Sequence, residues 1–186
     1  MHLDSLDDEE AIIEAAKCDI AYFKILYDQY YERIFSFIYR KLASEYRAAD
    51  ITSQTFLKAM NSLDSYEYRG VSFGAWLYRI ANNEVNQFYR QVKRNQTMYL
   101  EEDSVIEFLN TDEHEDKTAV LSQLKKFLDQ LSDEEIAILE LRFFENKDFK
   151  EIAFVLERKE SAVKMKAYRA IDKLRKMFKN ARIDDL

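Results

Sequence analysis

Hydrophobic positions in the first half of the chain recur at the spacing of helices. Between residues 19 and 42, apolar side chains return every three or four positions, as in Phe23, Leu26, Tyr30 and Ile34. This spacing predicts one long amphipathic helix over residues 19–42.

Two further helices are predicted before residue 95. Residues 50–63 form the first, with an expected inner side of Ile51, Phe56, Leu57 and Met60. Residues 73–94 form the second, and the polar segment 64–72 between them, which contains Gly70, is expected to be a loop.

The second half of the chain predicts a short helix, a tight turn and a basic helix. Ser132 is followed three residues later by Glu135, and Asp148 by Glu151. This is the signature of a capping box, so we expect helices over residues 133–144 and 148–156. A basic helix over residues 161–179 follows, and the combination is typical of a helix-turn-helix motif.

The composition favours an all-α protein. The 186 residues include two glycines and no proline, too few turn residues for a β-sandwich or barrel and too few glycines for a phosphate loop. We predict two small helical domains, residues 1–94 and 119–186. The acidic stretch 95–118, which lacks sustained periodicity, is expected to be a flexible linker.

Few residues are suited to metal, nucleophile or membrane chemistry. His2 and His114 are far apart, and the single cysteine, Cys18, excludes an intrachain disulfide and is interpreted as a small packing residue. The chain has no apolar run of 18 residues, so we expect no insertion into a membrane. We expect no catalytic residue, no metal and no cofactor.

The net charge of −7 is unevenly distributed. Residues 1–19 and 95–118 are strongly acidic, whereas residues 20–94 and 119–186 are net basic. Basic faces on an acidic protein indicate contact with a polyanion on selected faces, although solvated helix faces would give the same charge pattern.

One side of the predicted helix over residues 73–94 has the composition of a nucleic-acid face. It carries amides and cations at helical spacing and no carboxylate, and Glu84 falls to one side of it. Amides can read base edges and cations can bind phosphates, whereas an ordinary solvated face would include glutamates. The residues of this face are Arg79, Asn82, Asn83, Asn86, Gln87, Arg90, Lys93 and Arg94.

Aromatic side chains accompany this face. Tyr66 and Tyr68 lie in the polar loop beside Arg69, so we expect both rings to be exposed and able to stack on unpaired bases. Trp76 lies at the edge of the apolar stripe, where it fits either the core or a stacking role.

The basic C-terminal helix also has an outward stripe. Ser161, Lys164, Met165, Tyr168 and Arg169 share one side, and Lys166 borders it. The early positions of a recognition helix reach bases and later cations reach phosphates, although a charged terminal helix without a DNA role remains an alternative.

These residues, taken in order, resemble the sigma-70 family of RNA polymerase sigma factors, of the extracytoplasmic-function (ECF) type. The resemblance runs from about residue 17 to residue 178. Its N-terminal part rests on residues 23–34, on Asp50, Ile51 and Thr52 with residues 55–59, and on residues 73–83. Its C-terminal part rests on residues 131–144, 151–153, 163–164 and 168–170.

The resemblance implies a mechanism for each domain. In region 2, the helix with Asp50, Ser53 and Gln54 would bind the β′ clamp of core RNA polymerase. The loop 64–72 would hold a flipped base, and Arg79, Asn83 and Gln87 would contact the −10 element. In region 4, residues 161–169 would enter the major groove at the −35 element, beside the polymerase β flap. Such proteins are cytoplasmic, are not enzymes and are commonly held by an anti-sigma factor.

The turn of the helix-turn-helix departs from the family pattern. Where the family has Gly, an apolar residue and Ser, this chain has Glu157, Arg158 and Lys159. A residue other than glycine in a left-handed turn costs roughly 1 kcal/mol. Arg158 and Lys159 suggest added phosphate contacts as a compensation.

Other classes of protein remain open at this point. A helix-turn-helix regulator that does not bind core polymerase would share the C-terminal pattern. A relative that only titrates an anti-sigma factor would keep the whole fold. A small hydrolase with paired carboxylates finds no support in spacings such as ExxH, DxD or HD.

Overall fold

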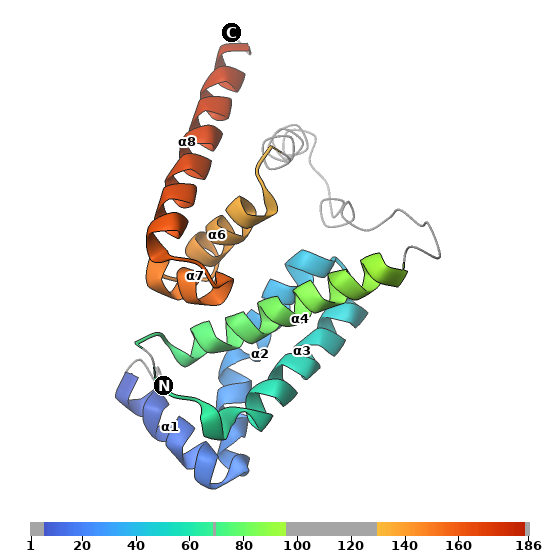
Figure 1. The fold of residues 1–186 in the computed structure, drawn as a ribbon, viewed down its shortest axis with the longest axis vertical. Coiled ribbons are helices and arrows are strands. Elements are labelled where there is room, and N and C mark those ends of the chain that lie inside the picture. The colour runs from blue at the N-terminus through green and yellow to red at the C-terminus, as the bar shows by residue number, and fades with distance from the viewer. Residues whose placement is uncertain (1–5, 69, 96–129, 185–186) are drawn as a thin grey trace. The chain divides into compact units, whose positions relative to one another are not determined.

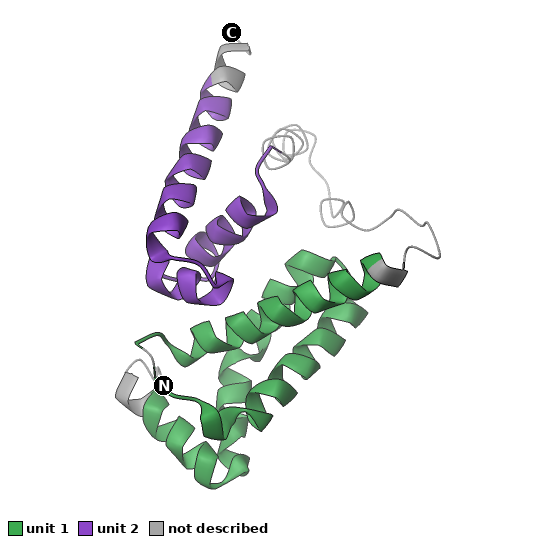
Figure 2. Cartoon of the chain, in the orientation of Figure 1, with its two compact units in different colours: residues 1–108 green, residues 109–186 purple. Residues whose placement is uncertain are grey.

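The computed structural model describes residues 6–68, 70–95 and 130–184, which belong to two compact units over residues 1–108 and 109–186 (Figures 1 and 2). All regular structure in these ranges is helical, as the composition predicts. The division falls inside the predicted linker, 95–118, and residues 96–129 lie outside the described residues.

The described residues of unit 1 form four α-helices and two short 3-10 turns (Figure 1). In order these are α1 (Leu6–Cys18), η1 (Ile20–Tyr22), α2 (Phe23–Leu42), α3 (Glu45–Asn61), η2 (Leu63–Ser65) and α4 (Phe73–Asn95). Helices α2, α3 and α4 pack on one another, and α1 packs against α2 and η2. The unit therefore presents the outer sides of α3 and α4 while their apolar sides are covered.

The core of unit 1 is rich in aromatic rings. Phe37, Phe73 and Tyr78 are fully buried. Phe37 and Tyr78 meet edge to face, with ring centroids 5.1 Å apart, an arrangement that adds to the free energy gained from burial. This core fixes α4 against α2, so the outer side of α4 has a defined orientation.

The N-terminal helix was not predicted from the sequence. Residues 6–18 form α1, whose Ile13 and Ala16 are buried. Cys18, expected to be a packing residue, is exposed at the end of this helix. The predicted helix over residues 19–42 begins instead with the 3-10 turn η1, because the Asp19 side chain accepts a hydrogen bond from the backbone N–H of Ala21.

Helix α3 is longer than expected at its start. It begins at Glu45, five positions before the predicted start, and Ala48 of this added turn is buried. Leu57, expected on the inner side, is exposed, so that prediction was wrong. Packing against α2 and α4 selects Ala48, Ile51, Thr55, Phe56 and Ala59 for the buried side.

Unit 2 contains three described helices, α6 (Asp133–Phe143), α7 (Phe149–Leu156) and α8 (Glu160–Asp184), with Ile138, Leu141, Ile152 and Val155 in its core. Both predicted capping boxes are confirmed. The Ser132 hydroxyl accepts from the Glu135 N–H, and the Glu135 carboxylate accepts from the Ser132 N–H at 2.8 Å. Asp148 and Glu151 repeat the exchange at the start of α7. These caps fix where α6 and α7 begin.

The turn between α7 and α8 is left-handed at a residue other than glycine. Glu157 has φ 55° and ψ 48°. The N–H of Arg158 donates to the carbonyl of Ala153 at 2.9 Å, and the N–H of Glu157 faces the carbonyl of Phe154 at 3.4 Å, which is the hydrogen-bond pattern of a Schellman motif. The chain thus makes the turn that glycine favours with a residue that carries a Cβ.

Candidate nucleic-acid interface

The outer side of α4 carries the predicted amides and cations. Asn83, Asn86, Gln87 and Arg90 are exposed, and Arg79 and Asn82 are half-buried at its base. The Nε of Arg90 donates to the carbonyl of Asn86 at 3.2 Å, which holds this guanidinium along the helix. The structure therefore brings these residues onto one face, as the spacing predicted; Lys93 is exposed beyond them, and the Arg94 side chain lies outside the described residues.

The single carboxylate of α4 is turned away from this face. Glu84 is only 6% exposed and accepts a hydrogen bond from the Lys58 ammonium of α3, with Oε1 and Nζ 2.6 Å apart. A buried carboxylate requires such a partner. The pairing ties α4 to α3 and leaves an outer face made of hydrogen-bonding amides and positive charge.

Tyr66 does not have the exposure expected of it. Its side chain is only 8% exposed and packs against Phe73 and Trp76, with ring centroids 5.3 and 5.0 Å away. Burial raises the pKa of the Tyr66 hydroxyl to about 12. The prediction of an exposed stacking ring at Tyr66 was wrong, because a polar local sequence does not reveal an aromatic cluster formed with α4.

The neighbouring aromatic residues divide between core and surface. Trp76 is half-buried in the cluster with Tyr66 and Phe73. This agrees with its position at the edge of the apolar stripe, for which the sequence left both a core role and a stacking role open. Tyr68 is 57% exposed, as expected, and is available for stacking. Arg69 lies outside the described residues.

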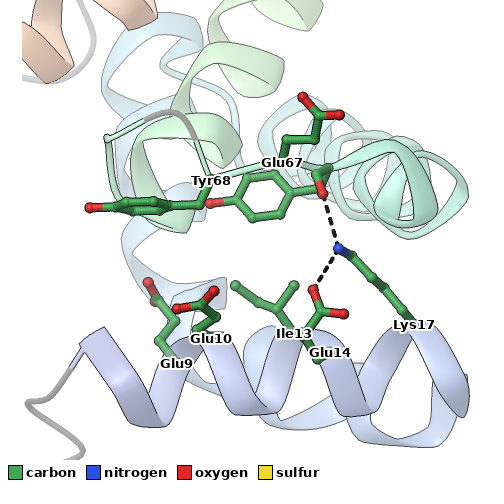
Figure 3. Close-up of a pocket in the computed structure, with 8 residues that line it drawn as sticks. Glu9, Glu10, Ile13, Glu14, Lys17, Glu67 and Tyr68 are labelled. Atoms are coloured by element: carbon green, nitrogen blue, oxygen red, sulfur yellow. Dashed lines mark hydrogen bonds and ion pairs between the residues drawn. The ribbon is translucent and has the colours of Figure 1, made fainter.

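Helix α1 supports this loop and forms a cavity of about 440 Å³ beneath it (Figure 3). The Lys17 ammonium donates to the carbonyl of Tyr66 at 3.0 Å and to Glu14 at 2.7 Å.

Glu9 accepts from the Tyr30 hydroxyl, and burial raises the pKa of Tyr30. In Figure 3 the side chains of Glu9 and Glu10 rise from α1 toward Tyr68. Because carboxylates dominate its rim, the cavity disfavours DNA phosphates, and α1 acts as a support for the loop.

Helix α3 presents the predicted polar side. Asp50, Ser53 and Gln54 are all exposed, and the Gln54 amide donates to the Asp50 carboxylate at 3.0 Å. Exposed Leu57 lies one turn beyond Ser53. The sequence placed this leucine in the core, so its part in the surface was missed. An exposed leucine beside polar groups is typical of a surface that binds another protein.

The outward stripe of α8 is confirmed as a surface. Ser161, Lys164, Met165, Tyr168 and Arg169 are all exposed. The Lys164 ammonium lies 2.7 Å from Glu160, and this hydrogen bond raises the pKa of the lysine. The face therefore combines exposed side chains with a local ion pair on α8 itself.

Phe149 at the start of α7 supports this stripe and was missed by the sequence analysis. Its ring centroid is 6.1 Å from that of Tyr168, and Lys164 lies 5.9 Å above the ring. Arg142 of α6 approaches the same ring to 5.2 Å. The sequence shows an aromatic residue, Phe149, directly after the Asp148 cap. Its position under α8 depends on the tertiary fold, which helical periodicity does not give.

Arg158 and Lys166 do not belong to the outward stripe. Arg158 Nε lies 3.0 Å from one carboxylate oxygen of Glu134, and Lys166 Nζ contacts the other oxygen. The hydrogen bond from Lys166 is the main cause that lowers the pKa of Glu134. Lys159, between the two helices, is exposed. Two of the basic residues that the sequence placed at the −35 interface, one in the turn and one beside the stripe, thus bind a carboxylate of α6.

The described ranges contain neither a cluster of metal ligands nor a helix suited to span a membrane. No group of three or more His, Cys, Asp or Glu side chains there is placed to hold a metal ion. None of the helices in those ranges has both the length and the apolar character needed to cross a membrane.

Comparison with known proteins assigns both units. Residues 26–95 match the family model Sigma-70 region 2, and residues 127–176 match Sigma-70, region 4. The chain is 30% identical over 165 residues to the ECF RNA polymerase sigma factor BldN of Streptomyces coelicolor, covering 82% of this chain and 59% of BldN. It is 30% identical over 131 residues to the RNA polymerase sigma factor SigV of Bacillus subtilis, covering 69% of this chain and 74% of SigV.

A solved structure shares the fold. The sigma factor RpoE of Bartonella quintana, crystallised with the anti-sigma factor NepR, has a TM-score of 0.60 and 21% identity to this chain. The match covers 84% of this chain and 96% of that one. The likeness confirms the helical fold.

Proposed function

The chain belongs to the sigma-70 family of RNA polymerase sigma factors, and from this premise we propose that it is an ECF sigma factor that binds core RNA polymerase and directs promoter-specific initiation. Proteins of this family are not enzymes. We propose accordingly that this chain contributes recognition of DNA and polymerase, with no catalytic centre of its own.

The observation that carries the proposal is the outer face of α4. Asn83, Asn86 and Gln87 project amides from a helix whose one carboxylate, Glu84, is buried against Lys58. Amides offer both a donor and an acceptor to a base edge, and Arg90 adds a cation for a phosphate. In this proposal Arg79, Asn83 and Gln87 contact the −10 element, and exposed Tyr68 stacks on an unpaired base.

Unit 2 would read the second promoter element. The exposed stripe of α8 has the position of a recognition helix after a short helix and a tight turn. Ser161, Lys164 and Met165 would reach base edges at −35, and Arg169 would reach a phosphate.

Two exposed surfaces would bind the polymerase. Asp50, Ser53, Gln54 and Leu57 of α3 would bind the β′ clamp, because they form an exposed polar side with an apolar neighbour. Phe143, which is 65% exposed at the end of α6, would contribute to the contact of unit 2 with the β flap. An anti-sigma factor is a further proposed partner, since RpoE was crystallised with one. We propose the cytoplasm, where polymerase and DNA lie, as the site of action.

Reconstituted transcription tests this function. The purified full chain is mixed with core RNA polymerase and a library of promoter fragments, and the transcripts are sequenced. We expect transcripts that require the chain and share −10 and −35 sequences. Absence of binding to core polymerase would overturn the proposal and return the chain to the class of ordinary helix-turn-helix regulators.

A further inference from the structure

A single carboxylate joins the three parts of unit 2 that surround the turn. Glu134 lies in the first turn of α6, Arg158 in the turn after α7, and Lys166 on α8. Each oxygen of the Glu134 carboxylate has its own cation, with Arg158 Nε 3.0 Å from Oε1 and Lys166 Nζ against Oε2. The two partners are 24 and 32 residues away along the chain, so the contact is a tertiary one.

The energy of these contacts is small compared with their geometric effect. Glu134 and Lys166 are partly exposed and Arg158 is more than half exposed. Pairs of this kind contribute about 0–1 kcal/mol each to the free energy of folding. Their consequence is therefore the direction in which the two cations point, rather than the survival of the fold.

The turn between α7 and α8 fixes the position from which the Arg158 side chain reaches Glu134. The backbone of Arg158 is held by its hydrogen bond to Ala153 in the Schellman motif, while Glu157 occupies a left-handed conformation that costs a non-glycine residue roughly 1 kcal/mol. The Glu134 carboxylate holds the side chain of the same Arg158. Backbone and side chain of this residue are thus fixed together, directly before α8 begins.

A second contact continues the same side of α8. The Lys173 ammonium, two turns after Lys166, donates to the carbonyl of Gln130 at 2.5 Å. Lys166 and Lys173 therefore face the α6 side, whereas Lys164, Tyr168 and Arg169 are exposed on the outward stripe. These cations of α8 thus divide into an inward pair, which contacts α6 and the residue Gln130 before it, and an outward set at the surface, where Lys164 pairs with Glu160 of its own helix.

We propose that Glu134 is a positioning residue for promoter recognition: it withholds Arg158 and Lys166 from DNA phosphates and uses them to fix the angle of α8 against α6. This inference rests on the proposed reading of the −35 element by unit 2. It replaces the expectation that Arg158 adds a phosphate contact. Sequence discrimination at −35 then depends on a residue outside the recognition helix.

Glu134→Gln tests the proposal, with Asp133→Asn as the matched control. Both changes remove one negative charge from the first turn of α6, but only Glu134 binds the two cations. The full chain is assembled with core polymerase. Its affinity is measured over a series of salt concentrations on a promoter fragment from the transcription screen and on the same fragment with a scrambled −35 element.

In the Glu134→Gln variant, the released cations can reach phosphates. We expect the slope of log affinity against log salt to steepen by about one to two, since each phosphate contact contributes about 0.9. We expect the ratio of affinities for intact and scrambled −35 elements to fall by about fivefold or more, the size of one lost base contact. Asp133→Asn should leave the ratio unchanged.

Lys166→Gln provides a second, independent variant. In the wild-type background it should leave the salt slope unchanged, because Lys166 binds Glu134 and not a phosphate. A slope reduced by about one would show a direct phosphate contact and overturn the proposal. An equal fall in the ratio for Glu134→Gln and Asp133→Asn would overturn it as well. Unfolding temperatures of all variants identify any that fail to fold.

The two proposals can fail separately. If the wild-type holoenzyme shows no preference for the intact −35 element, the reading of DNA by unit 2 is wrong. If the wild type has this preference and Glu134→Gln keeps it in full, the role of Glu134 alone is wrong.

Discussion

Helices α4 and α8 each expose one polar face, but the acidic residues of α4 and α8 lie in different places. On α4, Glu84 is buried and paired with Lys58 of the neighbouring helix, so the face consists of amides and cations. On α8, acids stay at the surface, where Glu160 pairs with Lys164 and Asp172 with Lys176. An ion pair within one helix therefore leaves a face of mixed charge, whereas a pair with another helix removes the carboxylate from that face.

The two units also differ in what supports the face. An aromatic cluster of Tyr66, Phe73 and Trp76 lies at the start of α4. Helix α8 rests on a largely aliphatic core, on the ring of Phe149 and on the contacts of Glu134. Large core rings contribute more to the stability of a domain than partly exposed ion pairs do. Substitutions in the two supports should therefore have effects of different size and kind.

The largest effect is expected from Tyr66→Ala. Removing a buried aromatic side chain costs about 3–5 kcal/mol of unfolding free energy. Hydrogen exchange measured by mass spectrometry should show faster exchange in α1–α4, with α6–α8 unchanged. Tyr68→Ala, which truncates an exposed ring two residues away, is the control and should leave exchange in α1–α4 unchanged. Similar exchange in both variants would contradict the burial of Tyr66.

A second substitution set compares the chemistry of the two faces. Asn83→Ala combined with Gln87→Ala should reduce discrimination between −10 sequences by about 2 kcal/mol or more without altering the salt slope. Arg169→Gln on α8 should weaken binding to all sequences and reduce the salt slope by about one. The measurement is holoenzyme affinity on promoter variants over a range of salt. If the two sets changed the same quantity, the distinction between base reading on α4 and phosphate binding on α8 would be wrong.

The smallest effects concern the left-handed residues. Glu157 in unit 2 and Ala43 in unit 1 have φ values of 55° and 49°, and Asn146 has 52°. Glu157→Gly and Ala43→Gly should each stabilise their own unit by roughly 0.5–1 kcal/mol, because glycine adopts this conformation without a Cβ penalty. Asn146→Gly is the matched control with a smaller gain, since asparagine tolerates the conformation. Urea titrations of the three variants measure these differences, and an equal gain at all three positions would contradict the explanation.

Local signals explain what the sequence could predict. The two capping boxes depend on residues three positions apart, and the structure confirms both. The faces of α4 and α8 follow from helical periodicity, which also places Asn83, Gln87 and Arg169 at the surface. The all-helical class followed in the same way from the scarcity of glycine and proline.

Nonlocal contacts explain what could not be predicted. Tyr66 lies in a polar segment and is buried only because Trp76 and Phe73 reach it from α4. Helix α1 was overlooked because its acidic residues mask a short apolar side, of which Ile13 and Ala16 are buried. The roles of Glu84 and Glu134 depend on cations 24 to 32 residues away, a separation that periodicity does not address.

The cluster at the start of α4 has an optical consequence. Trp76 is the only tryptophan among the 186 residues, and it lies in unit 1 with the rings of Tyr66 and Phe73 about 5 Å away. Excitation at a wavelength that tryptophan absorbs selectively will therefore produce fluorescence from unit 1 and none from unit 2. Its emission reports the environment of a half-buried indole next to the loop that carries Tyr68. The native protein thus contains a fluorescent probe beside the loop where an unpaired promoter base is proposed to stack on Tyr68, and no dye has to be attached to observe it.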